Sequence, residues 1–191
     1  DCSIDRFLEA MNWITEQGGY AIRMGMDVEQ PLPENLPPRI IDYATRFRSD
    51  FMDIYLPAKS RFYFGCGSGL HGGAYIFNVP LTAANFVPLT DVTSGKRSLF
   101  THKLLRRIDD DSLLSFPEIK EMGLFEHPPG GHYPHSVDGW EQETGTRWIE
   151  NSSEDVLDLC MEMMDFVEGR DPPPEARRLQ GIYRSFHDGP N

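Results

Sequence analysis

The chain has 191 residues, 39% of them hydrophobic, and its 18 basic and 30 acidic side chains give a net charge of −12 at pH 7. This length suffices for one domain with its own core. The acidity argues against nucleic-acid binding, which needs a basic surface for the phosphates, and no apolar run approaches the roughly 18 residues of a membrane span.

The first hundred residues alternate between helical and strand patterns. Apolar residues at helical spacing predict a helix from Ile4 to Ile14, and Ser49 begins a second helix that we expect to close near Pro57. Short apolar runs predict strands over 20–25, 40–44, 61–66 and 80–86. Strands that alternate with helices in this way indicate an α/β fold with a mostly parallel sheet flanked by helices.

The later chain is expected to be more helical. Capping patterns predict helices over 115–123 and 152–169, with a long polar loop over 126–147 between them. Three prolines at 172–174 stiffen the link to a last amphipathic helix. We therefore predict one domain over 1–170 and a Pro-linked C-terminal helix over 171–191 that packs back on it.

The most informative stretch is the glycine loop, Gly67-Ser68-Gly69-Leu70-His71-Gly72-Gly73, between a predicted strand and a predicted helical turn. Glycines let a ligand approach the main chain closely, and a helix N-terminus suits a phosphate or diphosphate. The alternative is a turn that only lets the helix pack tightly. The loop satisfies G-x-G-x-x-G, but the next strand ends at Asn85 and not at an acid that could hold a ribose, so a mononucleotide diphosphate fits better than NAD.

Arg23 lies late in a predicted buried strand, just before Gly25. A buried arginine is costly unless its guanidinium is paired or reaches a cleft. Two interpretations stay open: Arg23 grips a phosphate beside the glycine loop, or it forms a salt bridge with Asp42, Asp50 or Asp53.

Neither the histidines nor the cysteines predict a metal site. His127, His132 and His135 lie in a Pro/Gly-rich loop without helical spacing, and exposed loop histidines are the commoner explanation. The three cysteines are widely spaced and odd in number, which excludes a disulfide framework and fits a reducing compartment. With no N-terminal signal pattern, we expect a cytoplasmic protein. The start at Asp1 instead of Met leads us to expect part of a longer protein.

Several motifs, taken in order, resemble a bacterial glycosyltransferase family of surface-polysaccharide assembly. They are YAIRMG at 20–25, IIDYA at 40–44, RSDFMDIYL at 48–56, FGCGSG at 64–69, LSFPEI at 114–119 and IEN at 149–151. The resemblance implies a GT-B-like architecture, in which two Rossmann-like domains face one another across a cleft. It implies that this chain is the C-terminal, donor-binding half, and that an N-terminal domain of the same protein supplies the acceptor site. It also implies that no metal cofactor is needed.

On this reading the chain binds a nucleotide-diphosphate sugar and serves transfer of the sugar to a surface-polysaccharide or other glycan acceptor. The diphosphate would be held by Arg23, Gly67, Ser68 and Gly69, with His71 able to touch donor or acceptor. Asn85, Ser49 and Asp50 are further candidates for base, ribose or sugar contacts, and no catalytic residue is assigned. Two alternatives are a non-catalytic nucleotide- or sugar-binding module and an NAD-dependent oxidoreductase.

Overall fold

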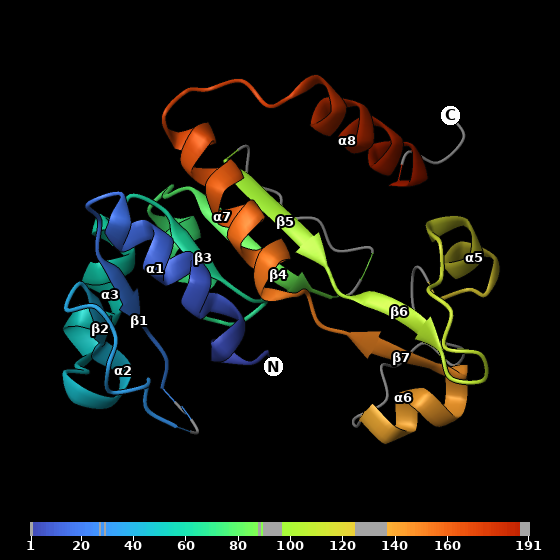
Figure 1. Cartoon of the computed structure of the whole chain (residues 1–191), viewed down its shortest axis with the longest axis horizontal. Helices are drawn as coiled ribbons and strands as arrows, with labels where there is room; N and C mark the ends of the chain where they lie inside the picture. Colours follow the sequence, from blue (N-terminus) through green and yellow to red (C-terminus); the bar gives the residue numbers. More distant parts are fainter. Residues whose placement is uncertain are drawn as a thin grey trace.

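The structure, a computed structural model, describes residues 2–26, 28, 30–87, 89, 97–124 and 137–187 (Figure 1). The first half of the chain forms a 3₁₀ turn followed by alternating helices and strands. These elements are η1 (Ile4–Phe7), α1 (Leu8–Glu16), β1 (Ala21–Arg23), β2 (Ile40–Asp42), α2 (Tyr43–Arg46), α3 (Asp50–Lys59), β3 (Tyr63–Gly65), α4 (His71–Ile76), β4 (Leu81–Phe86) and β5 (Ser98–His102).

The strands of this half are all parallel to their neighbours. β1 pairs with β2, with Ala21 opposite Ile40. β4 lies between β3 and β5, with Leu81 opposite both Tyr63 and Ser98. The predicted α/β class with parallel strands and flanking helices is therefore confirmed, and it is compatible with a Rossmann-like half-domain.

The second half adds a small antiparallel ribbon and four helices. They are β6 (Leu104–Arg107), α5 (Phe116–Glu121), α6 (Val137–Thr144), β7 (Thr146–Ile149), α7 (Ser153–Val167) and α8 (Pro174–His187). β6 and β7 run antiparallel beyond the end of β5, with α5 and α6 beside them, and α7 returns across β4 and β5 (Figure 1).

Two hydrophobic clusters form most of the core. In the first, α1 and α7 pack together over β4, with the fully buried residues Ala84, Val156 and Cys160 at its centre. The second lies under the ribbon and contains Leu89, Leu105, Leu114, Ile119, Leu124 and Trp140. The helix faces that fill these clusters follow the apolar spacing of their sequences, because residues three and four apart share one face.

Three details of the predicted secondary structure are wrong. The helix that was expected to close near Pro57 continues to Lys59, with Pro57 buried inside it. The predicted polar loop over 126–147 contains α6 and the start of β7. Tyr43 begins α2 and does not continue the preceding strand. The strands β5, β6 and β7 lie outside all the predicted strands, because their short runs mix apolar with basic or hydroxyl residues and gain stability only from their sheet partners.

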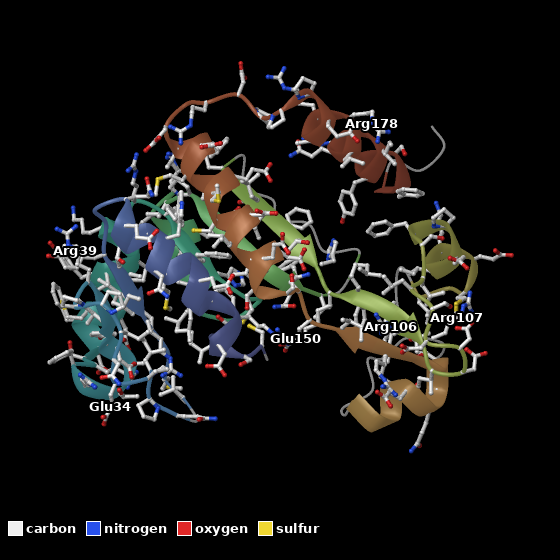
Figure 2. All side chains as sticks on the ribbon, in the orientation of Figure 1. Glu34, Arg39, Arg106, Arg107, Glu150 and Arg178 are labelled. Carbon is white, nitrogen blue, oxygen red and sulfur yellow. The ribbon has the colours of Figure 1, made fainter. Side chains whose placement is uncertain are left out.

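The one clearly basic run of the sequence, residues 103–107, lies in and just before β6, and acidic residues oppose its charges. Figure 2 labels Arg106 and Arg107 there. The ion pairs are Lys103–Glu150 at 3.5 Å, Arg106–Asp111 at 3.0 Å and Arg107–Glu118 at 3.1 Å. The run is therefore not a patch of unopposed positive charge.

The C-terminal helix α8 contacts both β5 and α5. The Tyr183 hydroxyl lies 2.5 Å from His102 Nε2, and the Tyr183 ring lies edge-on to Phe100 and Phe116. Burial raises the pKa of Tyr183 to about 12, so this hydroxyl keeps its proton. Within the described ranges, no helix has the length and apolar character that crossing a membrane requires.

Candidate functional site

A cavity of about 1500 Å³ is lined by β1 and β3, together with residues of η1 and α1. Its walls include β1 with the residues that follow it, Met24 and Gly25, and β3 with Cys66 and Ser68. Ligands of open α/β sheets bind where strands end at their carboxyl side and neighbouring strands diverge. The part of the cavity lined by the residues that follow β1 and β3 therefore occupies the kind of position at which such folds bind ligands.

Arg23, at the end of β1, lines the cavity. Its Nη1 donates to the backbone carbonyl of Gln30 at 2.6 Å and lies 3.5 Å from Asp42 Oδ1. The ion pair with Asp42, one of the two interpretations left open by the sequence, is thus present. Both contacts use Nη1, and among the described residues none accepts from Nε or Nη2, the two further guanidinium nitrogens that can donate.

Asp42 is held as a carboxylate. It is 6% exposed, and its Oδ2 accepts hydrogen bonds from the Leu32 N–H at 2.9 Å and the Thr45 hydroxyl at 2.6 Å. Burial works against the charged form, but these hydrogen bonds and the Arg23 guanidinium together lower the pKa of Asp42 below its usual value. Arg23 is thereby fixed in place at the wall of the cavity.

The glycine loop follows β3, and two of its glycines, Gly69 and Gly72, face open space. A methyl group added at Gly69 or Gly72 would meet no atom within 4 Å, and at Gly67 it would make ordinary contact with the Phe86 ring at 3.5 Å. None of the four loop glycines, all of which the structure describes, has a positive φ. Neither backbone conformation nor packing therefore requires glycine at 69 and 72. A methyl group added at Gly73 would make ordinary contact with Pro57 at 3.7 Å, so the alternative that these glycines only permit tight helix packing has no support there either.

Several amides of this loop have no partner among the residues that the structure describes. The N–H groups of Ser68, His71 and Gly72 donate to carbonyls two or three residues earlier. Among the residues that the structure describes, no acceptor lies within hydrogen-bonding reach of the Gly67, Gly69 and Leu70 N–H groups. Of these three amides, those of Gly69 and Leu70 are adjacent in the chain, and unpaired backbone amides are able to donate to an anion.

Ser68 and His71 bring side-chain chemistry to the loop. Ser68 lines the cavity, as does Tyr63, whose pKa is raised by burial. His71 begins α4, and its Nδ1 is buried with no hydrogen-bond partner in the described part of the chain. A buried ring nitrogen without a partner is costly, so it marks a position where a ligand group could bind.

The remaining candidates lie elsewhere or have structural partners. Asn85 is 3% exposed at the end of β4, and its N–H and Oδ1 form reciprocal hydrogen bonds with Asn151 at 2.6 and 2.7 Å. Ser49 caps α3 by accepting from the Met52 N–H, and Asp50 is exposed in the first turn of that helix. The cavity lining includes none of these three residues. Of the residues predicted from the sequence, Arg23 and Ser68 therefore line the cavity, whereas Gly67, Gly69 and His71 of the same loop do not.

Sequence reasoning missed one residue near the loop. Asn151 links β4, β5 and the start of α7. Asn151 and its partner Asn85 are 66 positions apart in the chain, and no local pattern relates them.

The described residues contain no cluster of three or more metal-ligating side chains. His127, His132 and His135 lie outside the described residues, so the expectation that they bind no metal stays a prediction. Comparisons of the sequence and the structure with protein-family models, with curated proteins and with solved structures gave no match. The functional argument therefore depends on the site alone.

Proposed function

We propose that the cavity between β1 and β3 binds the diphosphate of a nucleotide-activated sugar, and that the chain is the donor-binding part of a glycosyltransferase. The observation that carries the proposal is the glycine loop itself. Neither packing nor the backbone φ angle requires a glycine at position 69 or 72. The amides of Gly67, Gly69 and Leu70 have no acceptor among the described residues. Such a loop is explained if a ligand approaches its main chain closely.

The net charge of the chain explains why such a site would have to attract the diphosphate with a few nearby groups. The chain carries a net charge of −12, so its overall field repels an anionic donor. Binding must then depend on amides and on the guanidinium of Arg23, whose Nη1 contacts leave other donors. In a transfer reaction the same groups would stabilise the diphosphate as it leaves with the bonding electrons, and no metal would be needed for that step.

An exposed apolar face supports the proposed partner domain. α3 and α4 pack against each other, and large hydrophobic side chains of this region are 43% to 77% exposed. They are Phe47, Phe51, Ile54, Tyr55, Tyr75, Ile76 and Phe77. At roughly 100 Å² exposed for each large side chain, the face approaches the ~800 Å² that one partner contributes to a standard protein interface. We propose that another domain of the same protein covers it, in the cytoplasm, and brings the glycan acceptor.

The proposal is tested by calorimetric titration with UDP, GDP, other nucleoside diphosphates and NAD. We expect one nucleoside diphosphate to bind. Ser68→Ala should lower its affinity about tenfold through the loss of one hydrogen bond, and Gly69→Ala should lower it about tenfold because the ligand can no longer approach the main chain closely. Gly181→Ala in α8 is the matched control, because a methyl group there also meets no atom within 4 Å. Binding of NAD with silence toward every nucleoside diphosphate would contradict the proposal.

Turnover separates an enzyme from a binding module. The cognate nucleotide sugar would be incubated with the chain, alone and with the acceptor-binding domain, and released nucleoside diphosphate measured. Release that depends on the second domain supports a transferase. Tight binding without release under either condition favours the non-catalytic module.

A further inference from the structure

The cavity lies along two strand edges that have no partner strand. Its lining includes every residue of β1 and of β3, and no residue of β2, β4 or β5. Among the strands that the structure describes, β1 pairs with β2 alone and β3 pairs with β4 alone. The cavity therefore lies on the side of β1 that faces away from β2, and on the side of β3 that faces away from β4.

The strand pairing shows which backbone groups lie on these two edges. The Ala21 N–H donates to the carbonyl of the residue before β2 at 3.0 Å, so Ala21 directs its backbone groups toward β2. Successive residues of a strand direct theirs to alternate sides, so the N–H and C=O of Ile22 point away from β2. The Tyr63 N–H donates to the carbonyl of the residue before β4 at 2.8 Å. By the same rule, the N–H and C=O of Phe64 point away from β4.

These four backbone groups need partners. Ile22 and Phe64 both line the cavity, and in the described part of the chain no backbone hydrogen bond from a turn or loop reaches their N–H or C=O. Backbone groups in a protein interior are almost always paired. Rows of free N–H and C=O groups along a strand edge are the template that an extended segment of polypeptide recognises.

Helix α1 covers the space between the two edges with hydrophobic side chains. Met11 and Ile14 pack against the core cluster of β1 and β2 and also against the cluster over β4, and in Figure 1 α1 lies between β1 and α7. Both side chains, together with Trp13, line the cavity. Strands that helices cover in a parallel sheet are hydrophobic along most of their length. An occupant of this space therefore has to be hydrophobic as well as extended.

The volume of the cavity suits one strand. A strand of five residues is about 17 Å long and takes up about 4.8 Å of the width and about 10 Å of the thickness of a sheet, or roughly 800 Å³. The cavity holds about 1500 Å³. The remaining volume, about 700 Å³, is within the range of roughly 300–1,000 Å³ for ligand pockets. A strand beside β1 and β3 and a ligand at the glycine loop therefore do not exclude one another.

We propose that one extended hydrophobic strand, from a part of the same protein outside these 191 residues, lies between β1 and β3 and joins the two parallel sheets into one. The stretches of this chain outside the described residues contain no two consecutive hydrophobic residues, unlike a buried strand. The proposed strand would be a central strand of the sheet, so its absence would leave a gap in the core. Such a position suits a permanent segment of the same protein and not a transient partner. The inference does not depend on nucleotide binding.

The test is amide hydrogen exchange of single residues by NMR, without nucleotide, in the 191-residue chain and in the full-length protein. In the 191-residue chain the Ile22 and Phe64 amides should exchange at least about a hundredfold faster than those of Ala21 and Tyr63, which are bonded within the sheets. In the full-length protein all four should exchange slowly. Equal, slow exchange in the 191-residue chain as a monomer would mean that β1 and β3 pair directly, and would overturn the proposal. So would fast exchange of Ile22 and Phe64 in the full-length protein, or protection that appears only when the 191-residue chain dimerises.

A matched pair of proline variants locates the effect on the edge. Ile22→Pro removes the N–H directed at the proposed strand, and Ala21→Pro removes the one directed at β2. In the 191-residue chain Ala21→Pro should lower the urea midpoint more than Ile22→Pro, because proline is tolerated on an unpaired edge.

Synthetic 15-residue peptides that tile the rest of the protein identify the strand. One hydrophobic peptide should bind the 191-residue chain and slow exchange at Ile22 and Phe64, and Ile22→Pro should weaken its binding at least about tenfold. The proposal fails if no peptide slows these two amides, or if Ile22→Pro leaves the peptide affinity unchanged. The wild-type exchange rates decide the question even if a proline variant does not fold.

Discussion

Replacing Asn151 with alanine tests how the parallel sheet is joined to α7. Asn151 is 3% exposed. Its Oδ1 accepts from the Asn85 N–H at 2.6 Å, and its Nδ2 donates to the His102 carbonyl at 2.9 Å. One side chain therefore links the end of β4, the end of β5 and the residue before the α7 cap.

The size of the effect follows from these two bonds. Alanine leaves the Asn85 N–H buried without its acceptor, which costs about 1–3 kcal/mol, and loses a net hydrogen bond to His102, which contributes about 1 kcal/mol. We expect Asn151→Ala to lower the free energy of unfolding by about 2–4 kcal/mol. Urea unfolding followed by circular dichroism measures this as a lower midpoint at unchanged slope.

Two further variants make the test specific. Asn85→Gly removes only the acceptor of the Asn151 N–H and suits the φ of +55° at this position, so its cost should be smaller. Asn12→Ala in α1 removes an amide that makes no hydrogen bond to another described residue and should change stability by less than about 0.5 kcal/mol. An Asn151→Ala protein as stable as Asn12→Ala would refute the reasoning.

Three further predictions concern single residues. Gly69→Ala should leave the urea midpoint unchanged, whereas Gly123→Ala, at φ +70°, should cost about 1–2 kcal/mol. Tyr183→Phe should remove the hydrogen bond to His102 and lower the local stability of α8 by about 1 kcal/mol. Limited proteolysis should then cleave α8 faster than in the wild-type protein. Glu118 has its pKa lowered to about 2 by hydrogen bonds from Ser115. The stability that the Glu118 carboxylate provides is present above pH 4.5 and is lost as the pH falls toward 2. When unfolding is measured against pH, Glu118→Gln should therefore lose less stability over this range than the wild-type protein.

The patterns that are local in sequence were predictable. Apolar spacing located α1, α3 and α7, because a helix face that packs on a sheet repeats every three to four residues. Short apolar runs located β1 and β4. The alternation of strands and helices indicated parallel sheets, because two parallel neighbouring strands need a crossover connection, which is usually a helix.

The site was predictable only in part. The composition of the glycine loop marked it as unusual, but whether its glycines served packing or left space for a ligand depended on what lies opposite Gly69 and Gly72. The partner of Arg23 was one of three acids until the parallel register placed Asp42 directly opposite it. The proposed roles of Asn85, Ser49 and Asp50 came from their positions near the ends of helices and strands. Such a position does not determine whether a side chain lines the cavity, and none of these three does.

The sequence by itself determined an acidic α/β chain with a glycine loop after a parallel strand, because composition and periodicity are properties of neighbouring residues. Only the tertiary structure decided that β1 and β3 line one cavity and that Asn151 joins the ends of β4 and β5 to the start of α7. Contacts between residues dozens of positions apart arise from packing of whole elements, and no local pattern encodes them.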